Sequence, residues 1–234
     1  MKRVVAAVGG SVLVPALEEN RLKEWADTLI RLSTKGIQVL AVVGGGGEAR
    51  RYINACRALS LDEASSDEIG IMVTRINAAL LIGALKEYAY PRVAESYLQA
   101  KEFAVSGKIV VMGGVTPGQT TDAVSAVLAE ELGASMMIDL TAVDGIYSED
   151  PKKDPNAKKF DRMSPAELIS LIMKEKMNAG SNMIIDLVAA KVTERSGIPL
   201  VVMDGRNPKI LEDALLNGAF SGTIVGETDV PFPI

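Results

Sequence analysis

The amino-acid sequence predicts a three-layer α/β/α fold built around a mostly parallel central sheet. Short aliphatic runs alternate with segments of helical periodicity along most of the 234 residues. Hydrophobic residues make up 48% of the chain and aromatic residues only 4%, so the core is expected to be aliphatic, as is typical of helices packed on a parallel sheet. Glycine-rich loops follow three of the aliphatic runs. In such folds these loops share the carboxyl edge of the sheet, where ligands bind.

The first half of the chain contains two clear strand patterns and three helix patterns. Residues 4–8 and 37–43 are unbroken aliphatic runs and are predicted strands. Apolar residues at helical spacing predict a helix over 22–32, a second helix that starts at Glu48, and a third over 67–85. The apolar face predicted for the third helix consists of Ile69, Met72, Val73, Ile76, Leu80 and Gly83.

The second half continues the alternation. Buried strands are predicted at 109–112 and 136–140, with a helix over 121–132 between them. Residues 148–162 contain two prolines and many charges and are expected to form a surface loop. The remaining predicted elements are a helix over 181–195, a strand at 200–203, a helix over 210–216 and an edge strand at 223–225. Because no internal repeat divides the chain, we expect one domain over residues 1–234.

The composition excludes several kinds of chemistry. The chain has no histidine and a single cysteine, which rules out a Ser-His-Asp triad, histidine-ligated zinc, an internal disulfide and a cysteine-based zinc cluster. A net charge of −5 argues against nucleic-acid binding. The first strand follows Met1 almost directly, and no apolar run is expected to reach membrane-spanning length. We therefore expect a cytoplasmic protein that binds neither nucleic acid nor membrane.

The run Gly44–Gly47 is the most informative local feature. It lies between a buried strand and a helix, and this arrangement is typical of phosphate binding, because glycines let an anion approach the backbone while the helix start offers free N–H groups. Arg50 lies in the opening turn of the helix, where its guanidinium can fold toward the same anion. Similar loops occur at Gly9-Gly10-Ser11 and at Gly113-Gly114. Several such loops at one edge suggest a protein that holds several phosphates, as a kinase must.

The segment from Gly113 to Thr120 has the spacing of a P-loop, but Gln119 stands where the lysine is required, so a P-loop NTPase is excluded. The segment still offers donors at a helix start, and Asp122 could orient a cation. The structural alternative is that Thr121 or Asp122 only caps the helix.

A third group follows the strand at 136–140. Its position brings Thr141, Tyr147 and Asp150 to the ligand edge, and Lys153 would lie on an adjacent loop from which an ammonium group could follow a migrating phosphoryl group. A fourth candidate, Asp186, lies among apolar residues in the helix predicted over 181–195, and therefore needs a partner, a ligand or a solvent-facing position.

Taken in order, these residues resemble the amino acid kinase superfamily, and within it the uridylate (UMP) kinases of the archaeal type. The most specific motifs are Thr120-Thr121-Asp122-Ala123-Val124 and Val143-Asp144-Gly145-Ile146-Tyr147, followed by Asp150-Pro151-Lys152-Lys153-Asp154-Pro155. The likeness covers essentially the whole chain. It implies phosphoryl transfer from ATP to UMP, with Mg²⁺ carried mainly by the nucleotide phosphates and no metal site of protein ligands. It also implies a homohexamer built as a trimer of dimers, with the helix over 67–85 near a subunit contact.

The resemblance also implies a role for each motif residue. The catalytic residues would be Lys153, Asp186 and Asp122. The UMP site would consist of Gly45, Asp67, Val115, Thr116, Pro117, Gly118, Gln119, Thr120 and Thr121. The ATP site would consist of Gly10, Ser11, Gly46, Arg50, Thr141, Tyr147 and Asp150. Residues 1–140 would then form the acceptor-binding part of the domain and residues 141–234 the ATP-binding part.

Two positions depart from the pattern of the superfamily. Many relatives carry a lysine where this chain has Ala7, so Lys153 and Arg50 would have to neutralise more charge, or Lys2 or Arg3 would have to approach. Many relatives also carry Asn or Lys where this chain has Ala142. Two alternatives stay open: another phosphotransferase of the superfamily, and a non-catalytic nucleotide- or oxyanion-binding protein on the same scaffold.

Overall fold

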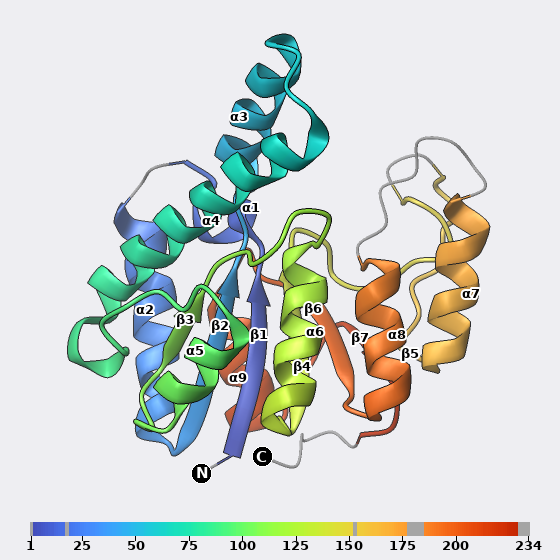
Figure 1. The fold of residues 1–234 in the computed structure, drawn as a ribbon. Helices are drawn as coiled ribbons and strands as arrows, with labels where there is room; N and C mark the ends of the chain where they lie inside the picture. Colours follow the sequence, from blue (N-terminus) through green and yellow to red (C-terminus); the bar gives the residue numbers. More distant parts are fainter. Residues whose placement is uncertain (1, 17–18, 152–153, 177–184, 229–234) are drawn as a thin grey trace.

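The structure, a computed structural model, describes residues 2–16, 19–151, 154–176 and 185–228 (Figure 1). Its centre is a seven-stranded sheet in the order β3-β2-β1-β4-β6-β7-β5. All pairings are parallel except that between β6 and β7. The strands are β1 (Lys2–Val8), β2 (Ile37–Val43), β3 (Val110–Met112), β4 (Met136–Thr141), β5 (Arg162–Met163), β6 (Leu200–Asp204) and β7 (Thr223–Val225).

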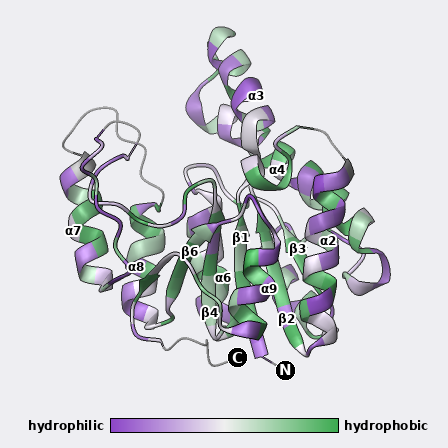
Figure 2. Ribbon diagram, turned by 180° about the vertical axis from the view of Figure 1, so that it is seen from behind, coloured by the Kyte–Doolittle hydropathy of each residue, from purple (hydrophilic) through white to green (hydrophobic). Residues whose placement is uncertain are grey.

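Helices cover both faces of the sheet, which confirms the predicted three layers (Figures 1 and 2). One core forms with α1 (Gly10–Leu13), α2 (Glu19–Thr34), α4 (Glu63–Leu85) and α9 (Lys209–Asn217). The other forms with α5 (Tyr97–Ala104), α6 (Thr121–Leu132), α7 (Pro165–Lys176) and α8 (Leu187–Ser196). Alternate residues of each strand point to opposite cores: Val4 and Ala6 enter the first, and Val5 and Ala7 the second. The helix α3 (Gly46–Ala58) and the start of α4 project beyond the sheet (Figure 1).

Most predicted elements are present, and two of the predictions about strands and loops were wrong. The strand at 223–225 is not an edge strand, because β7 lies between β6 and β5. The strand β5 begins at Arg162, inside the segment expected to be wholly a loop, and the same segment carries a bridge between Tyr147 and Lys159. The short helix η1 (Lys86–Tyr88) and the helices α1, α5 and α7 were not predicted.

The predicted face of the long helix α4 was also wrong. Met72, Ile76 and Leu80 are 55%, 59% and 40% exposed, whereas the buried face includes Thr74 and Asn77. The sequence pattern is ambiguous here because α4 is apolar on more than one side. From Glu63 to Tyr88 the chain is long and apolar enough to span a membrane by length and composition alone, contrary to the expectation that no run would be. The buried side of this helix packs on β2 and β3, as a core helix does.

The glycine loops pack against each other backbone to backbone. A Cβ atom on Gly10 would lie 2.2 Å from the amide nitrogen of Gly46, and one on Gly44 would lie 2.7 Å from the amide nitrogen of Gly10. Gly46 also has a φ of +65°. In contrast, a Cβ atom on Gly47 would meet nothing within 4 Å. Close packing therefore explains why Gly10, Gly44 and Gly46 are glycine. Gly47 is not under that constraint.

This contrast predicts opposite effects of one substitution at two neighbouring positions. Gly10→Ala should destabilise the fold by about 3 kcal/mol, because the new methyl group collides with backbone that cannot move aside. Gly47→Ala should be neutral or stabilise by about 0.5 kcal/mol, because it adds helix propensity in open space. Urea unfolding of both variants measures the difference, and equal losses at the two positions would contradict the packing argument.

Candidate functional site

The candidate site lies at the carboxyl edge of the central strands. Backbone hydrogen bonds tie each loop to the end of a neighbouring strand: the amide of Gly9 donates to Leu140 O at 3.0 Å, and that of Gly44 donates to Val8 O at 3.0 Å. The loop after β6 is tied in the same way, since the Gly205 amide donates to Thr141 O at 2.8 Å. Strand order therefore brings together loops that lie far apart in the sequence.

The loop around Gly44–Gly47 opens directly into α3, which begins at Gly46 rather than at Glu48. The first N–H groups of a helix have no partner inside it, so they are available to a ligand. Arg50 is exposed and lies more than one turn into α3, not in its opening turn. Gly10, Ser11, Gly45 and Gly46 are brought together at this edge as predicted.

The segment from Val115 to Thr121 folds back onto α4. The carboxylate of Asp67 accepts a hydrogen bond from the Gly118 amide at 2.8 Å, which brings the two parts of the predicted UMP site together. Gly118 has a φ of +77° and open space around it, so this turn requires glycine for its backbone conformation. Gln119 accepts from the Tyr97 hydroxyl at 3.3 Å. Thr116 and Gln119 are exposed, Pro117 is partly buried, and Val115 packs against the core on the α6 side of the sheet.

The cap of α6 is Thr120, not Thr121 or Asp122 as the structural alternative supposed. Its hydroxyl oxygen accepts from the Ala123 amide at 3.1 Å, and the hydroxyl donates to Asp186 in a short hydrogen bond. Asp186 in turn caps α8, accepting from the Ala189 amide at 2.7 Å. It is therefore not inside a helix as predicted, because α8 begins at Leu187, and part of the predicted helix (181–184) lies outside the described residues. One hydrogen bond thus joins the starts of α6 and α8.

Behind this junction lies a group of carboxyls. Burial, followed by the charge of Asp186, raises the pKa of Asp122 to about 7. Asp139 is 3% exposed, and its Oδ2 has no hydrogen-bond partner among the described residues. Burial, and then the charge of Asp122, raises the pKa of Asp139 well above its ordinary value. Sequence reasoning missed Asp139, although a single aspartate inside the aliphatic run Met136–Leu140 was a signal for it.

The segment after β4 carries the residues predicted to bind ATP. Thr141 ends the strand, and Tyr147 donates its hydroxyl to Asp144 at 2.8 Å. Asp150 accepts from the Asp154 amide through its backbone carbonyl at 2.9 Å. The Tyr147 hydroxyl, assisted by Lys159 at 3.4 Å, lowers the pKa of Asp144. Lys159 is a cation near this segment that sequence reasoning did not single out.

Three further cations were predicted to act at the site or to approach it. Lys153 lies outside the described residues. Lys2 and Arg3 cannot approach the site, because they lie at the amino end of β1, where Arg3 Nε donates to Gln38 at 2.9 Å. That expectation was wrong, since the amino end of a parallel strand lies at the opposite edge of the sheet. In the part of the chain that the structure describes, no cluster of three or more His, Cys, Asp or Glu residues could hold a metal ion.

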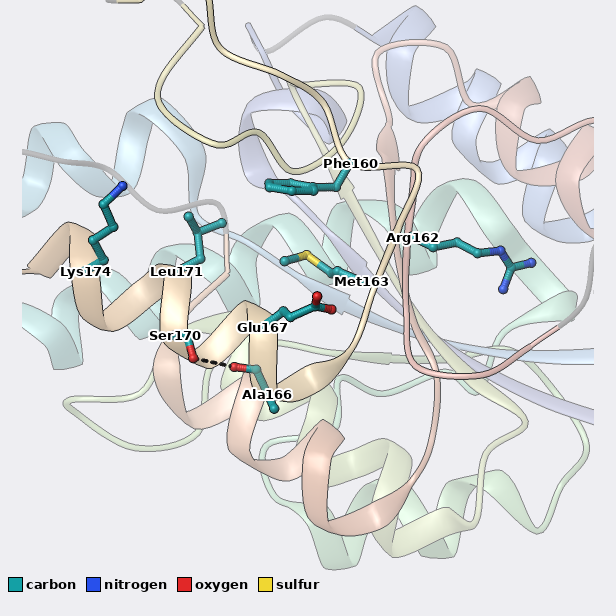
Figure 3. Close-up of a pocket in the computed structure, with 8 residues that line it drawn as sticks. All are labelled: Phe160, Arg162, Met163, Ala166, Glu167, Ser170, Leu171 and Lys174. Carbon is teal, nitrogen blue, oxygen red and sulfur yellow. Dashed lines mark hydrogen bonds between the residues drawn. The ribbon is translucent and has the colours of Figure 1, made fainter.

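A separate cavity of about 450 Å³ lies between β5 and α7 (Figure 3). Phe160, Met163 and Leu171 give it an apolar wall, and Lys174 stands at one end (Figure 3). None of the residues predicted to bind a nucleotide lines this cavity. We therefore keep it apart from the candidate site.

The raised pKa of Asp122 predicts how stability depends on pH. The folded state holds this proton more tightly than the unfolded chain, so the stabilisation is complete below about pH 4 and is lost as the pH rises toward 7. The wild type should therefore lose stability as the pH rises from 5 to 8, and Asp122→Asn should not, because the amide cannot ionise. The free energy of unfolding of Asp122→Asn should rise by about 1–2 kcal/mol relative to that of the wild type over this range. Chemical denaturation at a series of pH values measures this difference. Asp161→Asn, at an exposed position, is the matched control, and parallel pH curves for wild type and Asp122→Asn would refute the assignment.

Comparison with known proteins agrees with this geometry. The family model described as "Amino acid kinase family" matches residues 2–204. The chain is 75% identical over 234 residues to a protein named uridylate kinase from Methanocorpusculum labreanum, with both chains fully covered. It is 55% identical to the protein of the same name from Methanoculleus marisnigri, over 99% of this chain and 100% of that one.

Solved structures give the same result. The crystal structure of uridylate kinase from Archaeoglobus fulgidus superposes with a TM-score of 0.85 at 43% identity, covering 97% of this chain and 100% of that one. That of UMP kinase from Bacillus anthracis, at 24% identity and a TM-score of 0.81 over 98% and 97% of the two chains, supports the fold alone. The chain belongs to the amino acid kinase family.

Proposed function

We propose that this chain is a UMP kinase, a nucleoside monophosphate kinase that transfers the γ-phosphoryl group of ATP to UMP and gives UDP and ADP. The observation that carries the proposal is the contact between Asp67 and the Gly118 amide, because it folds the segment 115–121 onto the edge where the glycine loops meet. Full-length relatives named uridylate kinase support the same activity.

Phosphoryl transfer requires alignment and charge neutralisation more than covalent chemistry, so a chain without histidine can carry it out. The phosphate of UMP is itself the nucleophile and needs no general base. Backbone amides at the starts of α3 and α6 supply fixed donors for phosphate oxygens. Asp67 would hold the ribose, and Thr121 and its neighbours the acceptor phosphate and base.

The donor nucleotide would lie along the loops that follow β1 and β4. Gly10 and Gly46 would admit the phosphates, while Thr141 and Tyr147 would flank the rest of ATP. We propose Lys153 as the mobile ammonium group that follows the migrating phosphoryl group. Asp122 and Asp186 would orient cationic groups around it. Residues 141–234 would thus form roughly the ATP-binding part and residues 1–140 roughly the acceptor-binding part, with Gly10 and Gly46 reaching the ATP phosphates from the latter.

Mg²⁺ would enter with the phosphates of ATP. These phosphates would carry most of its contacts while the ion keeps several waters, because the raised pKa values of Asp122 and Asp139 disfavour the ionised carboxylates that coordinate a metal. When bound, Mg²⁺ neutralises charge on the transferred group. We place the reaction in pyrimidine nucleotide biosynthesis in the cytoplasm, with ATP and UMP as the small-molecule partners and without nucleic acid or membrane.

We further propose that the chain assembles as a homohexamer, a trimer of dimers. The support is the outer face of α4, where Met72, Ile76 and Leu80 are largely exposed along one side of the helix. Such an apolar stripe on a polar surface is typical of a face that a second copy covers.

Activity with a panel of acceptors tests the proposed function. Purified protein with ATP and Mg²⁺ should form UDP from UMP, and should turn over carbamate, acetylglutamate or aspartate far more slowly, because Asp67 is placed to read ribose. Lys153→Ala should lower kcat by about 10²-fold or more with nucleotide binding largely kept, since it removes a group that acts in the transition state. Binding of both nucleotides without any turnover in the wild type would instead favour the non-catalytic alternative.

The oligomer has its own test. Ile76→Glu should break the assembly into smaller species in multi-angle light scattering, because a charge cannot be buried unpaired in an apolar contact. Glu102→Lys, at an exposed position on α5, should leave the mass unchanged. A wild-type protein that stays monomeric at all concentrations would overturn the proposal.

A further inference from the structure

The buried face of α4 carries two polar side chains that each hold a different loop. Asn77 is 4% exposed, and its Nδ2 donates to Gly44 O at 3.0 Å and to Gly45 O at 3.4 Å. Thr74, one helical turn earlier and 8% exposed, accepts from the Gly114 amide at 2.7 Å. One rigid helix therefore grips the loop after β2 and the loop after β3.

These two polar groups face loop backbone rather than the aliphatic core. Ala78 and Leu81, further along α4, are fully buried in that core, whereas Asn77 and Thr74 are hydrogen-bonded to the loops after β2 and β3. Burying an amide or a hydroxyl is unfavourable unless its hydrogen bonds are made, and the Asn77 amide donates both of its hydrogen bonds to one loop. What this residue contributes is therefore the placement of the loop.

Close backbone packing makes the connection stiff. A Cβ atom on Gly113 would lie 2.7 Å from Thr74 Oγ1, and one on Gly114 would lie 2.9 Å from Ile71 Cγ1. On the other side, Gly46 is in equally tight contact with Gly10. A chain of contacts without slack thus runs from the first glycine loop through α4 to the loop that leads into residues 115–121.

We propose that Asn77 and Thr74 are positioning residues that fix the spacing between the loop after β2, whose Gly46 would face the donor phosphates, and the acceptor loop that follows β3. This inference rests on the proposed function, since the two loops matter jointly only if a phosphoryl group passes between them. Neither side chain needs to touch a nucleotide. Each loop can bind its own ligand without the other, but in-line transfer requires both in one alignment.

The expected signature is a loss of kcat without a matching loss of binding. Asn77→Leu keeps the branching and the number of heavy atoms of the side chain but removes both hydrogen bonds to the loop, so kcat should fall about 10-fold or more while KM for UMP and for ATP each change less than about threefold. Thr74→Val should act in the same direction, and Thr74→Ser, which keeps the hydroxyl, should restore kcat to near the wild-type value. Thr74→Val removes only one hydroxyl and serves if Asn77→Leu does not fold.

Gln38 provides a matched control within the same chain. It is 1% exposed, and its Nε2 donates to Ala104 O at 2.7 Å and Lys108 O at 3.0 Å, so Gln38→Leu also removes a buried amide that holds a loop. It lies at the amino edge of the sheet, far from the site. Gln38→Leu should lower the melting temperature about as much as Asn77→Leu but leave kcat unchanged.

The outcomes distinguish the positioning role of Asn77 and Thr74 from the proposed kinase activity. If the wild type forms no UDP, the proposed function fails and this inference fails with it. If the wild type is active and Asn77→Leu keeps its kcat, or loses kcat only as much as Gln38→Leu does, the positioning role alone is overturned. A rise in KM at constant kcat would also overturn it, because that result means that the loops bind more weakly rather than align poorly.

Discussion

The contact on which the rest of this structure depends is the backbone packing of the loop after β1 against the loop after β2. Gly10 and Gly46 approach so closely that neither could carry a side chain. The parallel strands β1 and β2 are neighbours and end level with each other, so the two loops that follow them must pack into the same small space. Glycine is the residue that solves this crowding, and the bare amides that result are suited to phosphate oxygens. Close packing and backbone amides suited to an anion are therefore two consequences of one constraint.

Electrostatics at the same edge is set by the carboxyls behind the loops. Asp122 and Asp139 are held away from water with Asp186 nearby, so each resists ionisation. Thr120 relieves part of this repulsion by donating to Asp186, and in doing so joins the starts of α6 and α8. Such a group is unstable as a set of anions but well suited to a site that receives cations together with a nucleotide.

Much of this could be predicted from the sequence where one signal dominates. Residues 37–43 and 121–132 are a strand and a helix with the predicted bounds, because aliphatic runs and helical periodicity are unambiguous there. The helix α7 was missed although Ser164 and Glu167 form a capping box, with reciprocal bonds of 2.7 and 3.2 Å. The inward face of α4 could not be predicted, since both sides are apolar. The hydrogen bond from the Gly118 amide to Asp67 joins residues 51 positions apart, so local pattern could not predict it, and only the family resemblance put both residues in one site.

The helix α4 carries polar residues on its buried side and apolar residues on its exposed side, in contrast to the usual pattern. An amphipathic helix normally turns its apolar side inward, yet here the buried side includes Thr74 and Asn77 while Met72 and Ile76 face outward. The inward polar groups are tolerated because loop backbone, which must be hydrogen-bonded, lies against them. The outward apolar groups form a stripe of the kind that a second surface would cover. A helix that holds catalytic loops on one side and meets a second copy on the other would transmit any shift at the contact directly to the spacing of those loops.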